Sequence, residues 1–200
     1  MNIEYYFEYL HLKSIGIKPK IKEAIKKFIE SFKNDSEKES WTIEYLPKLE
    51  FDSNGRIRNE LFEEIIFPVL WNGYKNKNVS LMIWLVKLEQ NYYQNTNIMK
   101  SMGYKSSNQI IRECYEIDPN NEEIIDLFLE LELKWISYAT HEWTDEFPYI
   151  LVGNDGATKE ECKKLLENIS FLHKLDRNKG YSKYINEYEK KIKQNIKMFK

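Results

Sequence analysis

The sequence predicts an all-α fold, either an irregular multi-helix bundle or a short stack of α-hairpins. With 7 Gly and 5 Pro in 200 residues, it has fewer turn formers than all-β folds usually carry. Lys, Glu and Leu, which are good helix formers, are abundant. Apolar side chains recur at helical spacing in most segments. We expect a mainly helical chain with room for one short strand near 41–46.

The first two predicted helices form the N-terminal part of the chain. Residues 3–14 are expected to form a helix that ends at Gly16. Pro19 then stands where a second helix can begin, because its missing N–H is not needed there. That helix has one apolar stripe, made of Ile21, Ala24, Ile25, Phe28, Ile29 and Phe32.

Residues 37–58 are ambiguous. Trp41, Ile43 and Tyr45 alternate with polar residues, which is typical of a strand. Pro47 limits the length of any element, and the sequence of 52–55 favours a turn. A short strand and a loop with a helical turn both remain open.

The sequence in the middle of the chain predicts two longer helices and two shorter ones. A helix is expected over 59–74, kinked or divided at Pro68. A second helix over 79–93 is apolar on nearly every side, which indicates burial. A helical turn over 95–106 ends at Gly103, and Ser106 or Ser107 is expected to cap a helix over 107–116.

Residues 122–141 show two conflicting patterns. Leu and Glu alternate over 127–135 as in a strand, but the length and the Leu/Glu composition favour a long helix capped by Asn121. The expected apolar face of that helix contains Ile124, Ile125, Phe128, Leu131, Trp135 and Tyr138.

Two further helices are expected after the irregular segment 142–157. Thr158 and Glu161 have the spacing of a capping box, in which two backbone donors are satisfied reciprocally. The helix they begin is expected to end around 178–180. A last helix has apolar side chains at helical spacing from Tyr181 to Phe199.

Composition predicts one globular, intracellular domain over 1–200, with a semi-independent hairpin over 1–35 as an alternative. Apolar residues make up 42% and charged residues 31%, which excludes a disordered chain. Cys114 and Cys162 are too few for a disulfide scaffold and are expected to be buried thiols. The longest apolar run, 81–86, is far shorter than a membrane span, and no signal peptide begins the sequence. We therefore expect a soluble, cytoplasmic protein with no membrane partner.

The densest cluster of polar and aromatic residues lies in the irregular segment after the long helix. Its candidate binding residues are His141, Glu142, Trp143, Asp145, Phe147 and Tyr149. A helical zinc motif H-E-x-x-H would need a second His at 145, where the chain has Asp. Gly153-Asn154-Asp155-Gly156 lacks the spacing of a phosphate-binding loop, and a turn before a capped helix explains it. No metal or cofactor is expected.

Charge is distributed unevenly along the chain. From Glu116 to Glu132 there are 7 acidic residues and no base, whereas 174–200 contains 9 bases and 3 acids. Residues 18–33 are also rich in Lys. Solvated helix faces account for such runs, and the formal net charge of −2 gives no general argument for nucleic acid.

One stretch resembles a unit of the tetratricopeptide repeat family. Residues 110–123, IIRECYEIDPNNEE, have a small residue, Cys114, on a helix followed by a turn with Pro119. The resemblance covers about 79–135, but no 34-residue period recurs and the consensus of the first helix is not met. It implies an α-hairpin stack that binds a protein or peptide in a groove.

The favoured function is therefore non-enzymatic binding of another protein. A bacterial immunity or antitoxin-like protein that neutralises a partner is one concrete form. The first alternative is an enzyme whose carboxylate and His groups lie around His141–Asp155. The second is nucleic-acid binding through the Lys-rich terminal helices, which the net charge disfavours.

Overall fold

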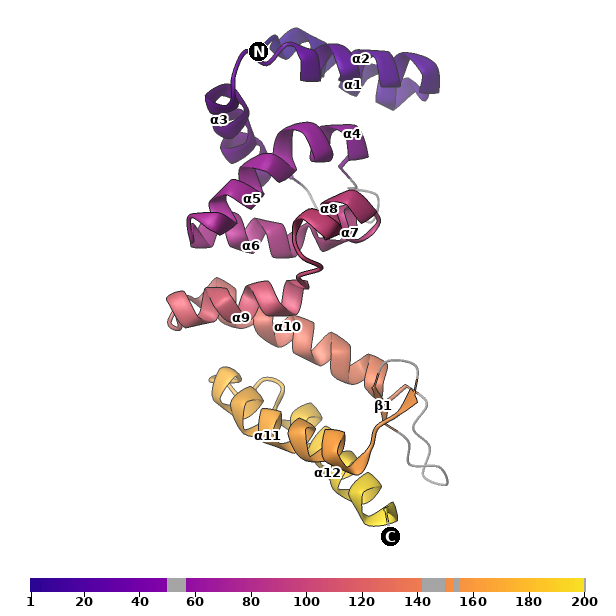
Figure 1. The fold of residues 1–200 in the computed structure, drawn as a ribbon, viewed down its shortest axis with the longest axis vertical. Helices are drawn as coiled ribbons and strands as arrows, with labels where there is room; N and C mark the ends of the chain where they lie inside the picture. Colours follow the sequence, from indigo (N-terminus) through magenta and orange to yellow (C-terminus); the bar gives the residue numbers. More distant parts are fainter. Residues whose placement is uncertain (50–56, 142–149, 153–154, 200) are drawn as a thin grey trace. The chain divides into compact units, whose positions relative to one another are not determined.

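The computed structural model confirms the predicted all-α fold (Figure 1). It describes residues 1–49, 57–141, 150–152 and 155–199. Contacts divide the chain into two compact units, Met1–Asp118 and Pro119–Lys200. Whether the two units form one domain, as the composition predicts, stays a prediction.

The first unit contains helices α1 to α9. In chain order they are α1 (Ile3–Ile15), α2 (Lys18–Glu30), α3 (Asp35–Tyr45), a 3₁₀ turn (Leu46–Lys48), α4 (Asn59–Leu61), a π-helical turn (Phe62–Ile66), α5 (Phe67–Lys75), α6 (Val79–Lys87), α7 (Glu89–Tyr93), α8 (Thr96–Ser101) and α9 (Ser107–Ile117).

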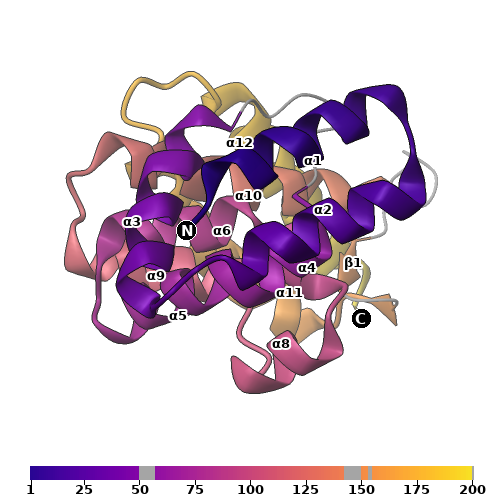
Figure 2. The same cartoon turned by 90° about the horizontal axis from the view of Figure 1, so that it is seen from above.

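Helices α1 and α2 pack as a hairpin and lie side by side (Figure 2), and the semi-independence of this hairpin stays a prediction. Gly16 ends α1 with φ 76°, a left-handed conformation that glycine adopts without steric cost. Pro19 stands in the first turn of α2. The apolar stripe of α2 is buried from Ile21 to Ile29, while Phe32 is half-buried.

The strand expected near 41–46 is wrong, because this segment belongs to α3 and the following 3₁₀ turn. Trp41 and Tyr45 are four residues apart and stack with ring centroids separated by 4.5 Å. Both rings also contact Tyr6 of α1. Ile43, the middle residue of the alternating pattern, is 50% exposed. Aromatic packing at helical spacing therefore decides the conformation.

The helix predicted over 59–74 is divided before Pro68, as expected. Proline cannot donate to the carbonyl four residues earlier, and its ring crowds that carbonyl. The chain widens into a π turn over Phe62–Ile66, where the Phe67 N–H donates to the Phe62 carbonyl. The carbonyl of Glu64, which Pro68 leaves without its helical donor, accepts a hydrogen bond of 3.3 Å from Lys38 Nζ.

The core of the first unit includes a close contact between α5 and α6. Gly73 of α5 is buried against Leu81, and the two helices approach closely because Gly73 has no side chain. Helix α6 is buried nearly all round, as its sequence predicted. Helix α9 packs on α6 and begins with a capping box of Ser106 and Gln109.

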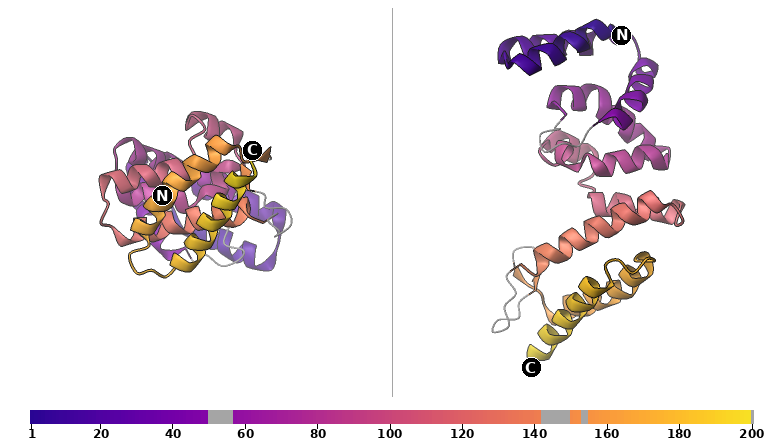
Figure 3. Two further views of the ribbon diagram at one scale, coloured as in Figure 1. Left: turned by 90° about the horizontal axis from the view of Figure 1, so that it is seen from below. Right: turned by 180° about the vertical axis from the view of Figure 1, so that it is seen from behind.

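The second unit contains α10 (Glu122–Ala139), a two-stranded antiparallel ribbon, α11 (Lys159–Leu175) and α12 (Ser182–Met198). Strands β1 (Leu151–Val152) and β2 (Asp155–Gly156) pair with Leu151 opposite Gly156. Helices α11 and α12 run side by side (Figure 3). Thr158 and Glu161 form the predicted capping box of α11.

The long segment 122–139 is a helix, but its buried face differs from the predicted one. Ile124, Ile125 and Phe128 are buried as expected, whereas Tyr138 is 49% exposed. Leu131 and Trp135 are only half-buried. The buried side continues instead through Leu129, Glu132, Ile136 and Ala139. The buried stripe, which includes Glu132, is therefore rotated by about one residue from the predicted one.

Among the described residues, no helix is both long enough and apolar enough to cross a membrane.

Candidate functional site

Most of the site predicted after α10 lies outside the described residues, namely Glu142, Trp143, Asp145, Phe147 and Tyr149. His141 is described and exposed. Its Nδ1 lies 2.6 Å from the carbonyl oxygen of Tyr138, and its ring stacks on the Tyr138 ring. The contact requires a proton on Nδ1 and satisfies a carbonyl at the end of α10. His141 therefore has a capping role.

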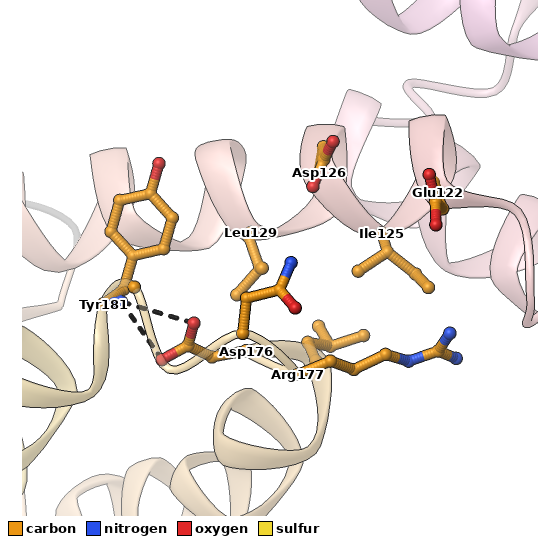
Figure 4. Close-up of a pocket in the computed structure, with 10 residues that line it drawn as sticks. Glu122, Ile125, Asp126, Leu129, Asp176, Arg177 and Tyr181 are labelled. Atoms are coloured by element: carbon orange, nitrogen blue, oxygen red, sulfur yellow. Dashed lines mark hydrogen bonds between the residues drawn. The ribbon is translucent and has the colours of Figure 1, made fainter.

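The second unit contains a groove that the sequence did not predict (Figure 4). One wall is the first half of α10, and the other is the turn Leu175–Tyr181 between α11 and α12. An inner hollow of about 210 Å³ continues into an outer hollow, because Asp126, Leu129 and Tyr181 line both. We call this feature the α10 groove.

Helix α10 contributes two parallel rows of side chains to the groove. The acidic row consists of Glu122, Asp126 and Glu130, all exposed. The apolar row consists of Ile125, Leu129 and Leu133. Residues four apart lie on one helix face, so each row repeats with a rise of about 6 Å. Figure 4 shows Ile125 and Leu129 pointing from α10 toward the turn.

The opposite wall is fixed by the buried carboxylate of Asp176. Its oxygens accept hydrogen bonds from the backbone N–H of Tyr181, at 3.1 and 3.2 Å, and from the Ser182 hydroxyl, at 2.9 Å. Asp176 is only 4% exposed. The carboxylate oxygens therefore accept the hydrogen bonds that hold the turn in place, and they are not directed at a ligand.

Arg177 ties this turn to the beginning of α10. Its Nη2 donates to the Pro119 carbonyl at 3.0 Å and to Asn120 Oδ1 at 3.5 Å. Both acceptors stand directly before α10. The Arg177 side chain therefore joins the two walls at one end of the groove, and its Nη2 is already hydrogen-bonded within the unit.

The acidic row has no cation partner within the part of the chain that the structure describes. None of the observed salt bridges involves Glu122, Asp126 or Glu130. Like charges four residues apart on a helix repel each other by a few tenths of a kcal/mol per pair. A positively charged ligand that lies along the row would remove this repulsion. Ile125 and Leu129 are each only 5% exposed, so the groove is suited to binding a cation beside Leu133 and Tyr181, the apolar side chains that remain accessible.

A second polar cluster, in the first unit, is structural. Glu113 of α9 accepts hydrogen bonds from Lys105 Nζ at 2.5 Å and from the Tyr74 hydroxyl at 2.7 Å. Burial raises the pKa of Glu113, but these two donors outweigh it, and the pKa lies below its ordinary value. The carboxylate is ionised and fully engaged, so it links α5 to α9 and is poorly placed for proton transfer.

The two cysteines are free and buried, as predicted. Burial raises the pKa of the Cys114 thiol to about 12, and burial also raises the pKa of Cys162. Cys162 Sγ donates to Asn195 Oδ1 at 3.2 Å. A protonated, enclosed thiol is a weak nucleophile, so both cysteines act as packing groups. Among the described side chains, no three His, Cys, Asp or Glu residues are arranged to hold a metal ion.

The sequence contained one signal for the groove. The acidic run from Glu116 to Glu132 stands out in it, but such a run by itself indicates only a solvated face. The two rows become a groove only through the turn around Asp176, about fifty residues away. No spacing rule connects those two segments.

Comparison with known proteins gave no relative: no family model, no curated protein and no solved structure matches this chain, and the resemblance of 79–135 to a tetratricopeptide unit stays a prediction.

Proposed function

We propose that this chain is a non-enzymatic binding protein and that its α10 groove receives a basic segment of a partner protein. The observation that carries the proposal is the acidic row on α10, which has no salt-bridge partner among the described residues, with the half-buried Leu133 and the exposed Tyr181 beside it. Carboxylates alone would attract any cation. The partly exposed side chains of Leu133 and Tyr181 beside them favour a partner with both kinds of side chain.

The spacing of the two rows fits a partner helix. A second helix has the same rise per residue, so Lys or Arg at every fourth position matches successive carboxylates of the acidic row. Leu or Ile on the neighbouring stripe of that helix would contact Leu133, the half-buried member of the apolar row. Tyr181, which is 51% exposed at the edge of both hollows, supplies an aromatic contact.

The turn that forms the second wall supports the proposal because it is held before any partner arrives. The hydrogen bonds of Asp176 and Arg177 fix its backbone. A wall that is already ordered loses little conformational entropy on binding, so more of the contact energy contributes to affinity.

Neutralisation of a basic partner, as by a bacterial immunity protein or antitoxin, is one concrete form of this function. The enzyme alternative depends on residues outside the described ranges. The nucleic-acid alternative depends on the Lys-rich terminal helices. Neither has an observation of comparable weight, and an acidic groove disfavours a phosphate backbone.

A designed peptide that carries both kinds of side chain tests the proposal. The probe is a fluorescein-labelled peptide of Leu, Ala and Lys, about 16 residues long, with Lys at every fourth position beside a Leu stripe. A peptide of the same composition in scrambled order is the reference. Fluorescence anisotropy should show tighter binding of the ordered peptide, and binding should weaken as salt rises from about 0.05 to about 0.5 M.

Charge reversal on α10 should remove this preference. Two exposed ion pairs contribute about 1–2 kcal/mol together, and reversal adds repulsion, so D126K/E130K should weaken binding at least about tenfold. Glu167→Lys adds a positive charge on an exposed part of α11 that does not line the groove, and it should change the affinity less than about twofold. Equal binding of the two peptides, or equal losses in both variants, would contradict the proposal.

A further inference from the structure

The outer hollow of the α10 groove brings together two carboxylates, an aromatic ring and apolar side chains. Asp126 and Glu130 are exposed and lie one turn apart on α10, with a rise of about 6 Å between them. Tyr181 stands at the edge of the hollow and is 51% exposed. Leu129 and Leu133 complete the lining. Among the described residues, no basic side chain lines this hollow.

Arg177 lines only the inner hollow, and its side chain is held toward the beginning of α10. The hydrogen bonds of its Nη2 to Pro119 and Asn120 fix it there. Figure 4 shows its guanidinium and the Tyr181 ring at opposite ends of the inner hollow. An incoming cation is therefore received at the Tyr181 end of the groove, where the two carboxylates of the outer hollow lie.

We propose that the outer hollow selects arginine over lysine in the basic segment that the α10 groove receives, an inference that rests on the proposed function. A guanidinium is planar and carries N–H donors along several edges, so one group can donate to Asp126 and Glu130 together. A lysine ammonium is a compact, more strongly hydrated charge without a planar face. The two carboxylates one turn apart are therefore better matched by arginine.

Tyr181 strengthens this preference because its ring offers a face to the same cation. A guanidinium stacks flat on an aromatic ring while its edges still donate to carboxylates. An ammonium over the ring turns some of its donors away from the carboxylates. Figure 4 shows the ring pointing from the turn toward α10, and the Tyr181 N–H is fixed by hydrogen bonds to Asp176. The aliphatic stem of the arginine would lie against the half-buried Leu133.

Two labelled peptides that differ only in their cations test the selection. The first is the ordered peptide of Leu, Ala and Lys described above, and the second has Arg at every Lys position. Arginine and lysine have similar helix propensities, so the free peptides are comparable. Fluorescence anisotropy with the whole chain should give a dissociation constant about fivefold lower for the Arg peptide. The scrambled Arg and Lys peptides measure the general attraction of each cation, and they should differ by less than about twofold.

Substitutions of Tyr181 assign the preference to its ring. Tyr181→Leu keeps an apolar side chain but removes the aromatic face, and it should reduce the preference for the Arg peptide to less than about twofold. Tyr181→Phe keeps the ring and should retain the preference. Tyr184→Leu is the matched control, because Tyr184 is 39% exposed on α12 and does not line the groove. Far-UV circular dichroism checks that every variant keeps its helices.

The outcomes separate this inference from the proposed function. If the ordered Lys peptide binds no better than its scrambled form, the groove does not receive a basic helix and both proposals fail. If the ordered Lys peptide binds better but the Arg peptide gains nothing over it, only the selection of arginine is overturned. A gain for arginine that persists unchanged in Tyr181→Leu, or that is lost equally in Tyr184→Leu, also overturns it.

Discussion

Substitution of Gly73 by alanine tests the close contact between α5 and α6. A Cβ atom at Gly73 would lie 2.5 Å from both Cβ and Cδ1 of Leu81. Real Cβ atoms do not approach other heavy atoms this closely. Cβ of Leu81 is fixed to its backbone, so rotation of the side chain cannot relieve the contact. One of the two helices must shift.

Two opposing effects set the magnitude. Alanine is favoured over glycine inside a helix by about 1 kcal/mol. Overpacking in a well-packed core destabilises by about 1–3 kcal/mol, and here two side-chain atoms and a helix backbone must move. Because several atoms must move, we take the upper part of this range, about 2–3 kcal/mol, and expect G73A to lower the free energy of unfolding by about 1–2 kcal/mol. Steric strain thus outweighs helix propensity.

Urea unfolding followed by circular dichroism measures the change, and hydrogen exchange of the 67–87 amides assigns it to α5 and α6. Gly180→Ala is the matched control, because the nearest atom to a Cβ there, Asp176 Oδ1, is 4.0 Å away. Trimming Leu81 to alanine in the G73A background should recover part of the loss expected from the two changes added together. If G73A is as stable as the wild type, the helices are not in the close contact described.

Three further predictions concern hydrogen bonds, backbone conformation and pH. Asp176→Ala removes a buried carboxylate that accepts hydrogen bonds from the Tyr181 N–H and the Ser182 hydroxyl. Urea unfolding should show a loss of about 2–3 kcal/mol in the free energy of unfolding. No change would mean that the turn does not need the carboxylate. Lys179 has φ 55°, so Lys179→Gly should relieve strain and stabilise by up to about 1 kcal/mol, and a clear loss in melting temperature would refute this. Hydrogen bonds from Lys105 and Tyr74 lower the pKa of Glu113 below its ordinary value of 4.5. The ionised carboxylate therefore stabilises the fold fully above pH 4.5, and this stabilisation is lost as the pH falls further, through the lowered pKa. Glu113→Gln should therefore lie closer to the wild type in acid than at neutral pH, and a constant difference across that range would contradict the assignment.

Local signals determined many helix boundaries. Gly16 ends α1, and the predicted capping box at Thr158 begins α11. Ser106, one of the two expected caps, begins α9. Each of these features depends on residues only a few positions apart. Pro68 likewise divided its helix, because the missing donor and the steric crowding are properties of proline itself.

Predictions of which side of an element is buried were less accurate than predictions of where helices begin and end. The alternation of Trp41, Ile43 and Tyr45 suggested a strand, yet Trp41 and Tyr45 stack on one side of α3 against Tyr6. On α10, Glu132 lies on the buried side, where a rule that keeps charges outside would not place it. In both cases the packing of distant segments outweighed the local pattern.

The sequence by itself determined the helical class, most element boundaries and the burial of both cysteines, since these follow from local hydrogen bonding and from the spacing of apolar residues. Only the tertiary structure revealed the α10 groove, because its acidic row and its opposing turn come from segments far apart in the chain. It also distinguished the covered face of α1 from the exposed one, since both faces are apolar in sequence. Burial depends on which neighbours approach, and the spacing of residues within one helix does not contain that information.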